Sequence, residues 1–241
     1  MKTFRDFLRI LIIVLVFFRF LPAGEENVFE GGISYIPSVL NLRGDGFQNL
    51  PDMYRGGNSN WSGEDLTGIW FLHGVEGYLR FVGNTLLGVE VFAGEKNFSG
   101  TAQDTSLFAG ADLAGVAAFI EWGVPAGRRF EVLVGGSLGL NRFRIHYSAV
   151  KQVPSWNELT DARISPLTCT TMDSGFRACL KPYISLKYRI MDRLGFEMST
   201  SLLVSRYPQS GWTINGHIPL GDGVEISVYS PGIHLGLMLG L

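Results

Sequence analysis

Most of the chain after residue 24 alternates apolar and polar residues in steps of two. Within 129–147, for example, Val132 and Val134 alternate with Glu131 and Gly135. Successive side chains of a β-strand point to opposite faces, so this period predicts strands with one apolar and one polar face. We predict eight such strands, at 29–35, 69–81, 85–95, 107–123, 129–147, 175–190, 194–206 and 233–241.

The connections between these segments alternate between long and short. Three are tight turns, near 82–84, 124–128 and 191–193, and four are longer, near 37–65, 96–106, 148–174 and 207–222. An even number of antiparallel strands, with brief turns on one side and long loops on the other, is typical of transmembrane barrels. We therefore predict an all-β fold: an antiparallel up-and-down transmembrane β-barrel of about eight strands, with short periplasmic turns and four long external loops.

Composition adds a reason for the barrel. The chain has 241 residues, 46% of them hydrophobic and 17% charged, and its mean hydropathy is +0.18. No segment after residue 24 is long and apolar enough for a transmembrane helix, so we expect the apolar strand faces to meet lipid. A net charge of −2 offers no general attraction to nucleic acid, which we exclude as a partner.

The N-terminus has the pattern of an export signal. Three basic residues precede an apolar run, Ile10–Phe18, and small residues follow at Ala23 and Gly24. A retained anchor is the alternative, but a spanning helix needs about 20 apolar residues. We predict a signal peptide at 1–23, removed on export, and a barrel domain at 24–241 in the outer membrane.

We expect the polar strand faces to fill the barrel interior, because an eight-stranded barrel is only wide enough for side chains. On segment 107–123 we assign Leu113, Ala117 and Phe119 to the outer face and Asp112 to the inner face. Buried charges are costly unless paired, so we predict a structural network of ion pairs, with a narrow conduit for ions or small solutes as the alternative. Its predicted members are Glu30, Glu76, Arg80, Glu90, Asp112, Glu131, Arg177, Lys181, Lys187, Arg189 and Glu197.

The chain ends on the alternation Gly236-Leu237-Met238-Leu239-Gly240-Leu241. With the strand count and loop order, this ending resembles the eight-stranded outer-membrane barrels of the OmpA-transmembrane, OmpX and OmpW kind, over nearly all of residues 25–241. The resemblance implies insertion by the barrel-assembly machinery, although the family usually ends on an aromatic residue where this chain has Leu241. It also implies passage of small hydrophobic molecules for the OmpW kind, which the charged interior argues against.

One motif suggests an enzyme. His146-Tyr147-Ser148 resembles the His-x-Ser of outer-membrane lipid A deacylases, with Glu158 as the residue that would orient the histidine. The asparagine expected after the serine is Ala149 here, so a lipid A acyl hydrolase is kept as an alternative and a non-enzymatic protein is the leading prediction. Arg142 and Arg144 share the face of His146, just past the apolar span, and could meet lipid head groups.

Other candidate chemistry is sparse. Cys169 and Cys179 could form a disulfide that pins the third long loop in an oxidising compartment. The histidines lack metal-ligand spacing, so we expect neither a metal nor a cofactor. We expect a monomer that contacts outer-membrane lipid and presents loops 37–65 and 148–174 to an external ligand, or that serves envelope integrity.

Overall fold

A computed structural model describes residues 31–50, 54–56, 59–102, 105–127, 129–150, 167–221 and 223–240. The predicted signal peptide, Glu30 and Glu158 lie outside these residues, as does most of the predicted loop 148–174. Among the described residues, no helix is long and apolar enough to cross a membrane.

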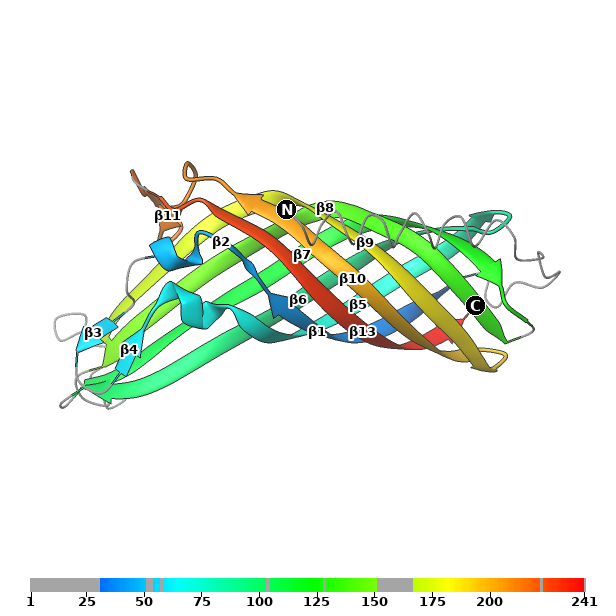
Figure 1. The fold of residues 1–241 in the computed structure, drawn as a ribbon, viewed down its shortest axis with the longest axis horizontal. Coiled ribbons are helices and arrows are strands. Elements are labelled where there is room, and N and C mark those ends of the chain that lie inside the picture. The colour runs from blue at the N-terminus through cyan, green and yellow to red at the C-terminus, as the bar shows by residue number, and fades with distance from the viewer. Residues whose placement is uncertain are drawn as a thin grey trace.

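Eight long strands form one closed antiparallel sheet (Figure 1). They are β1 (Gly31–Leu42), β5 (Gly68–Val82), β6 (Thr85–Ala102), β7 (Thr105–Pro125), β8 (Phe130–Val150), β9 (Leu167–Met191), β10 (Leu194–Tyr207) and β13 (Ile226–Gly240). Each strand pairs with its neighbours along the chain, and β13 pairs with β1, so the sheet has no open side. The predicted all-β, up-and-down barrel of eight strands is confirmed.

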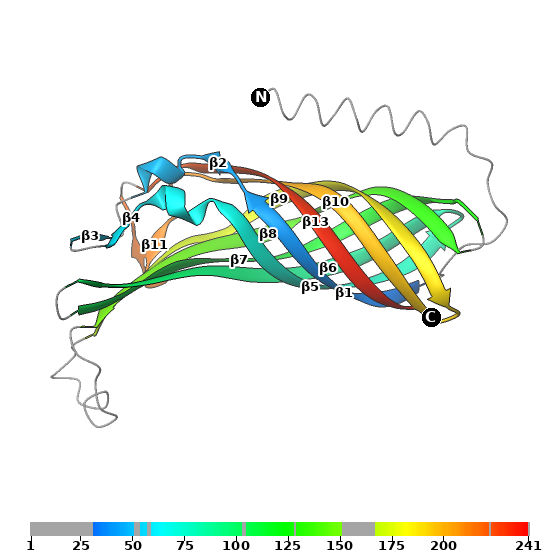
Figure 2. The same ribbon diagram turned by 60° about the horizontal axis from the view of Figure 1, so that its bottom comes forward.

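The two ends of the barrel differ (Figure 2). At one end, short turns join β5 to β6, β7 to β8 and β9 to β10, and the pair Gly32↔Gly240 places both ends of the described barrel there. The other end carries short elements between the long strands. They are β2 (Gly44–Asp45), η1 (Phe47–Asn49), β3 (Tyr54–Gly56), β4 (Ser59–Trp61), η2 (Gly63–Leu66), β11 (Thr213–Ile214) and β12 (Ile218–Pro219).

Several predicted loops are partly strand. The prediction of a long loop at 96–106 is wrong, because the β6–β7 ladder runs on to the pair Ala102↔Thr105. Likewise, β1 continues to Leu42 and β9 begins at Leu167. The stretches on β6 and β9 are rich in polar residues because they stand beyond the lipid-facing surface, where a strand can show water-compatible side chains on its outer side.

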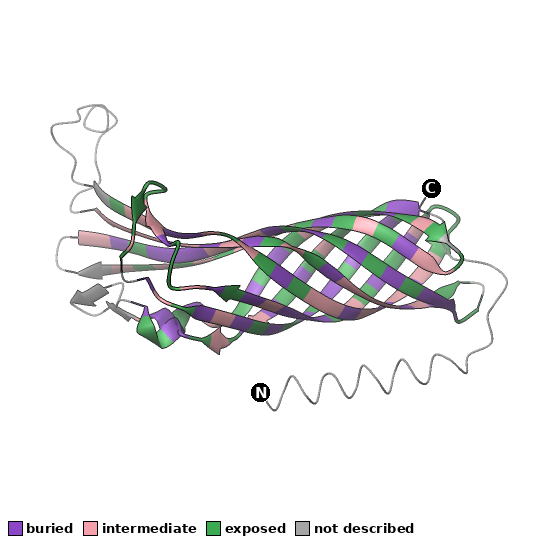
Figure 3. Ribbon diagram, turned by 90° about the horizontal axis from the view of Figure 1, so that it is seen from above, coloured by how far each residue is buried: buried purple, intermediate pink, exposed green. Residues whose placement is uncertain are grey.

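Buried and exposed residues alternate along the strands, as Figure 3 shows. The exposed side chains of the barrel wall are largely apolar; examples are Val89, Leu138 and Leu237. An apolar outer band around a closed sheet is the surface that a bilayer requires, since a closed sheet leaves no open strand edge facing the hydrocarbon. We call this band the apolar belt. It ends near Leu140 on β8, where Arg142 and Arg144 follow on the same face.

The face assignment on β7 was wrong. Leu113, Ala117 and Phe119 point inward and are buried, whereas Asp112 lies on the outer face. The two faces differ little in polarity there, because alanines and glycines occupy both faces of 109–118. Asp112 is tolerated outside because it stands beyond the belt, where a charge no longer faces hydrocarbon.

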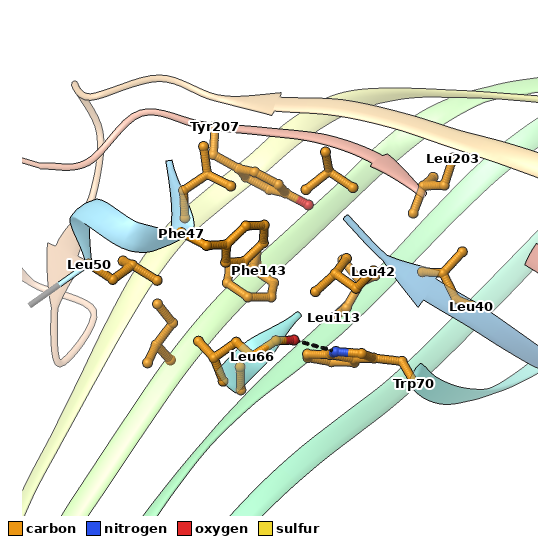
Figure 4. Packing of buried hydrophobic residues seen from close by; sticks show 14 of the residues in the cluster. Leu40, Leu42, Phe47, Leu50, Leu66, Trp70, Leu113, Phe143, Leu203 and Tyr207 are labelled. Carbon is orange, nitrogen blue, oxygen red and sulfur yellow. Dashed lines mark hydrogen bonds between the residues drawn. The ribbon is translucent and has the colours of Figure 1, made fainter. Parts of the chain in front are cut away.

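The interior near the short turns holds the charged side chains together with a small apolar cluster around Tyr78 and Phe119, and a larger apolar cluster fills the other end. Figure 4 shows this larger cluster, which we call the apolar cluster and in which Phe47 of η1 and Leu66 of η2 pack against residues of the strands. The Phe47 and Phe143 rings meet edge to face at 5.9 Å. The Trp70 indole N–H donates to the Leu66 carbonyl at 2.7 Å. Part of the predicted external loop 37–65 therefore folds into the barrel mouth.

The predicted disulfide is also wrong. Cys169 and Cys179 both lie on β9 and are free, one exposed and one buried. Ten residues of extended strand separate them by about 30 Å, whereas a disulfide needs Cα atoms within about 7 Å.

We expect this separation to show in thiol labelling. A maleimide reagent should modify Cys169 in the folded protein, and Cys179 only after unfolding, because the barrel wall buries the second thiol. Mass mapping of the labelled peptides under non-reducing conditions checks the result. A peptide pair linked through Cys169 and Cys179 within one chain would contradict the strand assignment.

The apolar cluster should also contribute to stability. Phe143→Ala removes a fully buried ring, and we expect a loss of about 3–5 kcal/mol in the free energy of unfolding. Phe71→Ala is the control, because Phe71 is exposed on the belt and lipid can fill the space it leaves. Urea unfolding in lipid vesicles, followed by gel mobility, measures both variants; equal losses would show that the cluster does not pack as described.

Candidate functional site

The charged part of the interior is organised around Lys187 on β9. Its Nζ lies 3.1 Å from Glu121 Oε2 on β7 and 3.7 Å from Glu197 Oε2 on β10. The ammonium also lies over the ring of Tyr78 on β5, 4.0 Å from its centroid. Lys187 is fully buried, and four strands are tied together through one cation.

Two further ion pairs cross the interior. Arg80 Nη2 donates to both carboxylate oxygens of Glu131, at 2.8 and 3.0 Å. Lys181 pairs with Glu90, which also accepts a hydrogen bond of 2.6 Å from the Ser137 hydroxyl. Because each pair joins strands that are not adjacent in the sheet, the interior is braced across its width.

The carboxylates around Lys187 outnumber their cation. Glu76 is buried in the same region, and oxygens of Glu76, Glu121 and Glu197 have no hydrogen-bond partner among the described residues. A cavity of about 40 Å³ adjoins Glu76 and Glu197, which is room for one or two waters that could satisfy such oxygens.

The predicted network is thus largely gathered in one place, with exceptions. Glu76, Arg80, Glu90, Glu131, Lys181, Lys187 and Glu197 all face the interior. Arg177 instead donates to the Ser210 carbonyl near the far end at 3.3 Å, and Arg189 is half-buried close to a short turn. Asp112 is outside the barrel. Sequence reasoning missed Glu121, because reversing the faces of β7 placed it on the lipid side.

A second polar group lies on the outer surface just beyond the belt. Arg144 Nε donates to Asp112 Oδ1 at 2.7 Å, and Arg142 forms a two-point ion pair with Asp173. The hydrogen bond from Arg142 holds the pKa of the Asp173 carboxyl below its usual value. Asp173 was missed because the sequence placed it inside an external loop.

The structure does not assemble the hydrolase motif. His146 Nε2 lies 3.2 Å from Asn97 Oδ1, and its Nδ1 lies 3.9 Å from Asp112 Oδ2. Ser148 is two residues farther along β8, at about 7 Å in an extended strand, and a nucleophile must lie within about 3.2 Å of its base. Glu158 lies outside the described residues.

His234 is placed between two serines in the interior. Its Nδ1 lies 2.6 Å from the Ser38 hydroxyl and its Nε2 lies 2.5 Å from the Ser201 hydroxyl. The sequence offered no signal for this bridge, because the three residues come from β1, β10 and β13. In the part of the chain that the structure describes, no three His, Cys, Asp or Glu side chains are placed to hold a metal ion.

Comparison with known proteins finds solved structures of similar fold, among them three with identities of 10–12%. No family model matches the chain, and no curated protein matches it. Neisserial surface protein A is 10% identical, with 87% of this chain and 98% of that one covered and a TM-score of 0.45. Ail of Yersinia pestis, solved with the heparin analogue sucrose octasulfate, is 10% identical, with coverages of 86% and 99% and a TM-score of 0.43. OprG of Pseudomonas aeruginosa is 12% identical, with coverages of 88% and 98% and a TM-score of 0.41.

We expect the charge network to depend on Lys187. Lys187→Met leaves buried carboxylates without a counter-charge, and we expect a loss of about 3–5 kcal/mol in the free energy of unfolding, measured in urea. The double variant Lys187→Met, Glu121→Gln should recover much of that loss, because it also removes a negative charge. A single variant as stable as the wild type would contradict the network.

Proposed function

We propose that this protein is a non-enzymatic outer-membrane barrel that binds partners at the cell surface through the strands that extend beyond its apolar belt. The observation that carries the proposal is the extent of β6, β7, β8 and β9 past the belt, above an interior closed by packed side chains. We further propose that a single chain acts as a monomer, inserted by the barrel-assembly machinery, because it closes its own sheet.

The filled interior favours a binding role over a conduit. The apolar cluster occupies the outer half and buries Trp70, Phe143 and Tyr207 almost completely. Below it, the Lys187 network crosses the barrel from β7 to β10. An ion would have to pass both an apolar layer and a set of paired charges, each of which opposes its passage.

The other candidate sites on the exposed surface, which are the hydrolase motif and the two predicted binding loops, have less structural support than the strand extension. Asn97 contacts the His146 nitrogen that a nucleophilic serine would have to approach, which argues against the acyl hydrolase. The predicted binding loop 37–65 sends Phe47 and Leu50 into the barrel mouth, so its apolar residues serve packing. Most of loop 148–174 lies outside the described residues.

The extension has a strand edge that lies outside any ladder among the described residues, and along it Phe98 makes a further contact. The β5–β6 ladder ends at Leu72↔Gly94, whereas the β6–β7 ladder continues to Ala102↔Thr105. Among the described residues, β7 is the only ladder partner of β6 from Glu95 onward; β4 comes near β6 without a ladder. Free N–H and C=O groups of an edge strand can bind an extended peptide as an added strand. The partner we propose is therefore an extended polypeptide segment.

A deletion that follows the strand register tests this function. Removing residues 98–109 joins Asn97 to Gly110 above the pair Lys96↔Ala111, and Asn-Gly is a favoured two-residue hairpin turn. The probe is reduced, carboxymethylated α-lactalbumin, an unfolded chain, with native α-lactalbumin as its control. We expect cells that carry the wild type to bind the unfolded probe, and cells that carry the deletion variant to lose most of that binding.

Gel mobility of unboiled samples must first show that the deletion variant still forms a barrel. Equal binding by the folded variant and the wild type would overturn the proposed edge. Equal binding of native and unfolded α-lactalbumin would overturn strand addition as its mode.

A further inference from the structure

The outer face of the barrel is hollowed on the side formed by β8, β9, β10 and β13. A groove of about 380 Å³ opens there. Its apolar walls are Leu138, Ala178, Leu180, Val204 and Tyr229. All five side chains belong to the outward face of their strands, in the half of the belt away from the short turns. The groove therefore opens toward the outer leaflet of the bilayer.

The hollow has a cause in the sequence of β9. The β9–β10 ladder pairs Ser201 with Tyr183 and then resumes at Val204↔Leu180. The interruption falls at Pro182, which has no N–H to donate to a neighbouring strand. Ala178 then contributes only a methyl group where its outer-face neighbours Phe176, Leu180 and Leu140 carry large side chains. A loosened seam and a small side chain leave space in the wall.

One cationic side chain, Arg206, stands at the upper edge of the groove. It follows Val204 on the outer face of β10, and its side chain is 70% exposed although its Nη2 and Nε contact Glu225 at 2.8 and 3.0 Å. Exposed ion pairs are weak, so an anion can compete for the free guanidinium N–H groups of Arg206.

We propose that this groove seats an acyl chain of a phosphorylated lipid of the outer leaflet, with the lipid phosphate at Arg206. The position of the groove favours a lipid chain, because the groove opens on the belt. A molecule from water would have to pass the charged rim to reach it. Its volume is near the lower end of the roughly 300–1,000 Å³ range of small-molecule sites, which suits one chain of a lipid.

The proposal is independent of the β6 edge. The groove lies on β8, β9, β10 and β13, and the deletion of 98–109 leaves its residues in place. Loss of lipid binding and loss of peptide binding can therefore be separated.

Native mass spectrometry of the full-length protein in detergent tests the groove, with bis-phosphorylated, hexa-acylated lipid A as the titrated probe. Ala178→Leu fills the groove from the outside, and we expect about tenfold weaker binding of the first lipid. Ala93→Leu is the matched control, since Ala93 is an exposed alanine on the outer face of β6, away from the groove. It should bind as the wild type does.

The phosphate contact has its own variant. Arg206→Gln should weaken binding of lipid A but leave binding of its dephosphorylated form unchanged, and Arg193→Gln, at the exposed turn of the opposite end, is the control. Wild-type affinity of Ala178→Leu for lipid A, or an equal loss of affinity in Ala93→Leu, would overturn the proposal that the groove binds a lipid chain. Equal affinity for phosphatidylglycerol and lipid A would overturn the preference for the outer-leaflet lipid.

Discussion

Pairing of β1 with β13 closes the sheet, and this closure determines what can lie inside and outside the barrel. Once Gly32 pairs with Gly240 and Val39 with Ile233, every long strand has two neighbours along the belt. Backbone groups are then satisfied within the wall, and the side chains are free to meet lipid outside and each other inside. A polar residue on the inner face must find its partner within that enclosed space.

The interior meets this requirement in two ways. Near the short turns, charged side chains pair across the barrel, with Lys187 between Glu121 and Glu197. At the other end, η1 and η2 fold inward and apolar side chains pack around Phe143. Ion pairs therefore stabilise one end of the barrel, and apolar packing stabilises the other. The strand extensions beyond the belt stand above a mouth that side chains fill.

The period of two was enough to predict the strands and most of the inward-facing charges. It failed on β7, where alanine and glycine on both faces left Asp112 as a misleading guide and hid Glu121. It also failed beyond the belt, where polar residues such as Asn97 suggested a loop although the ladder continues. The sequence contains no signal for the contacts of His234 with Ser38 and Ser201, because they depend on the register between neighbouring strands.

We propose that the closed barrel lies in the outer membrane. Gel migration of the outer-membrane fraction, with and without boiling, tests this location and the closure together, because a closed sheet resists detergent until it is heated. We expect the protein to be recovered in this fraction and to migrate differently when unboiled. Recovery in the soluble fraction, with identical migration of both samples, would show that the chain is not a membrane barrel.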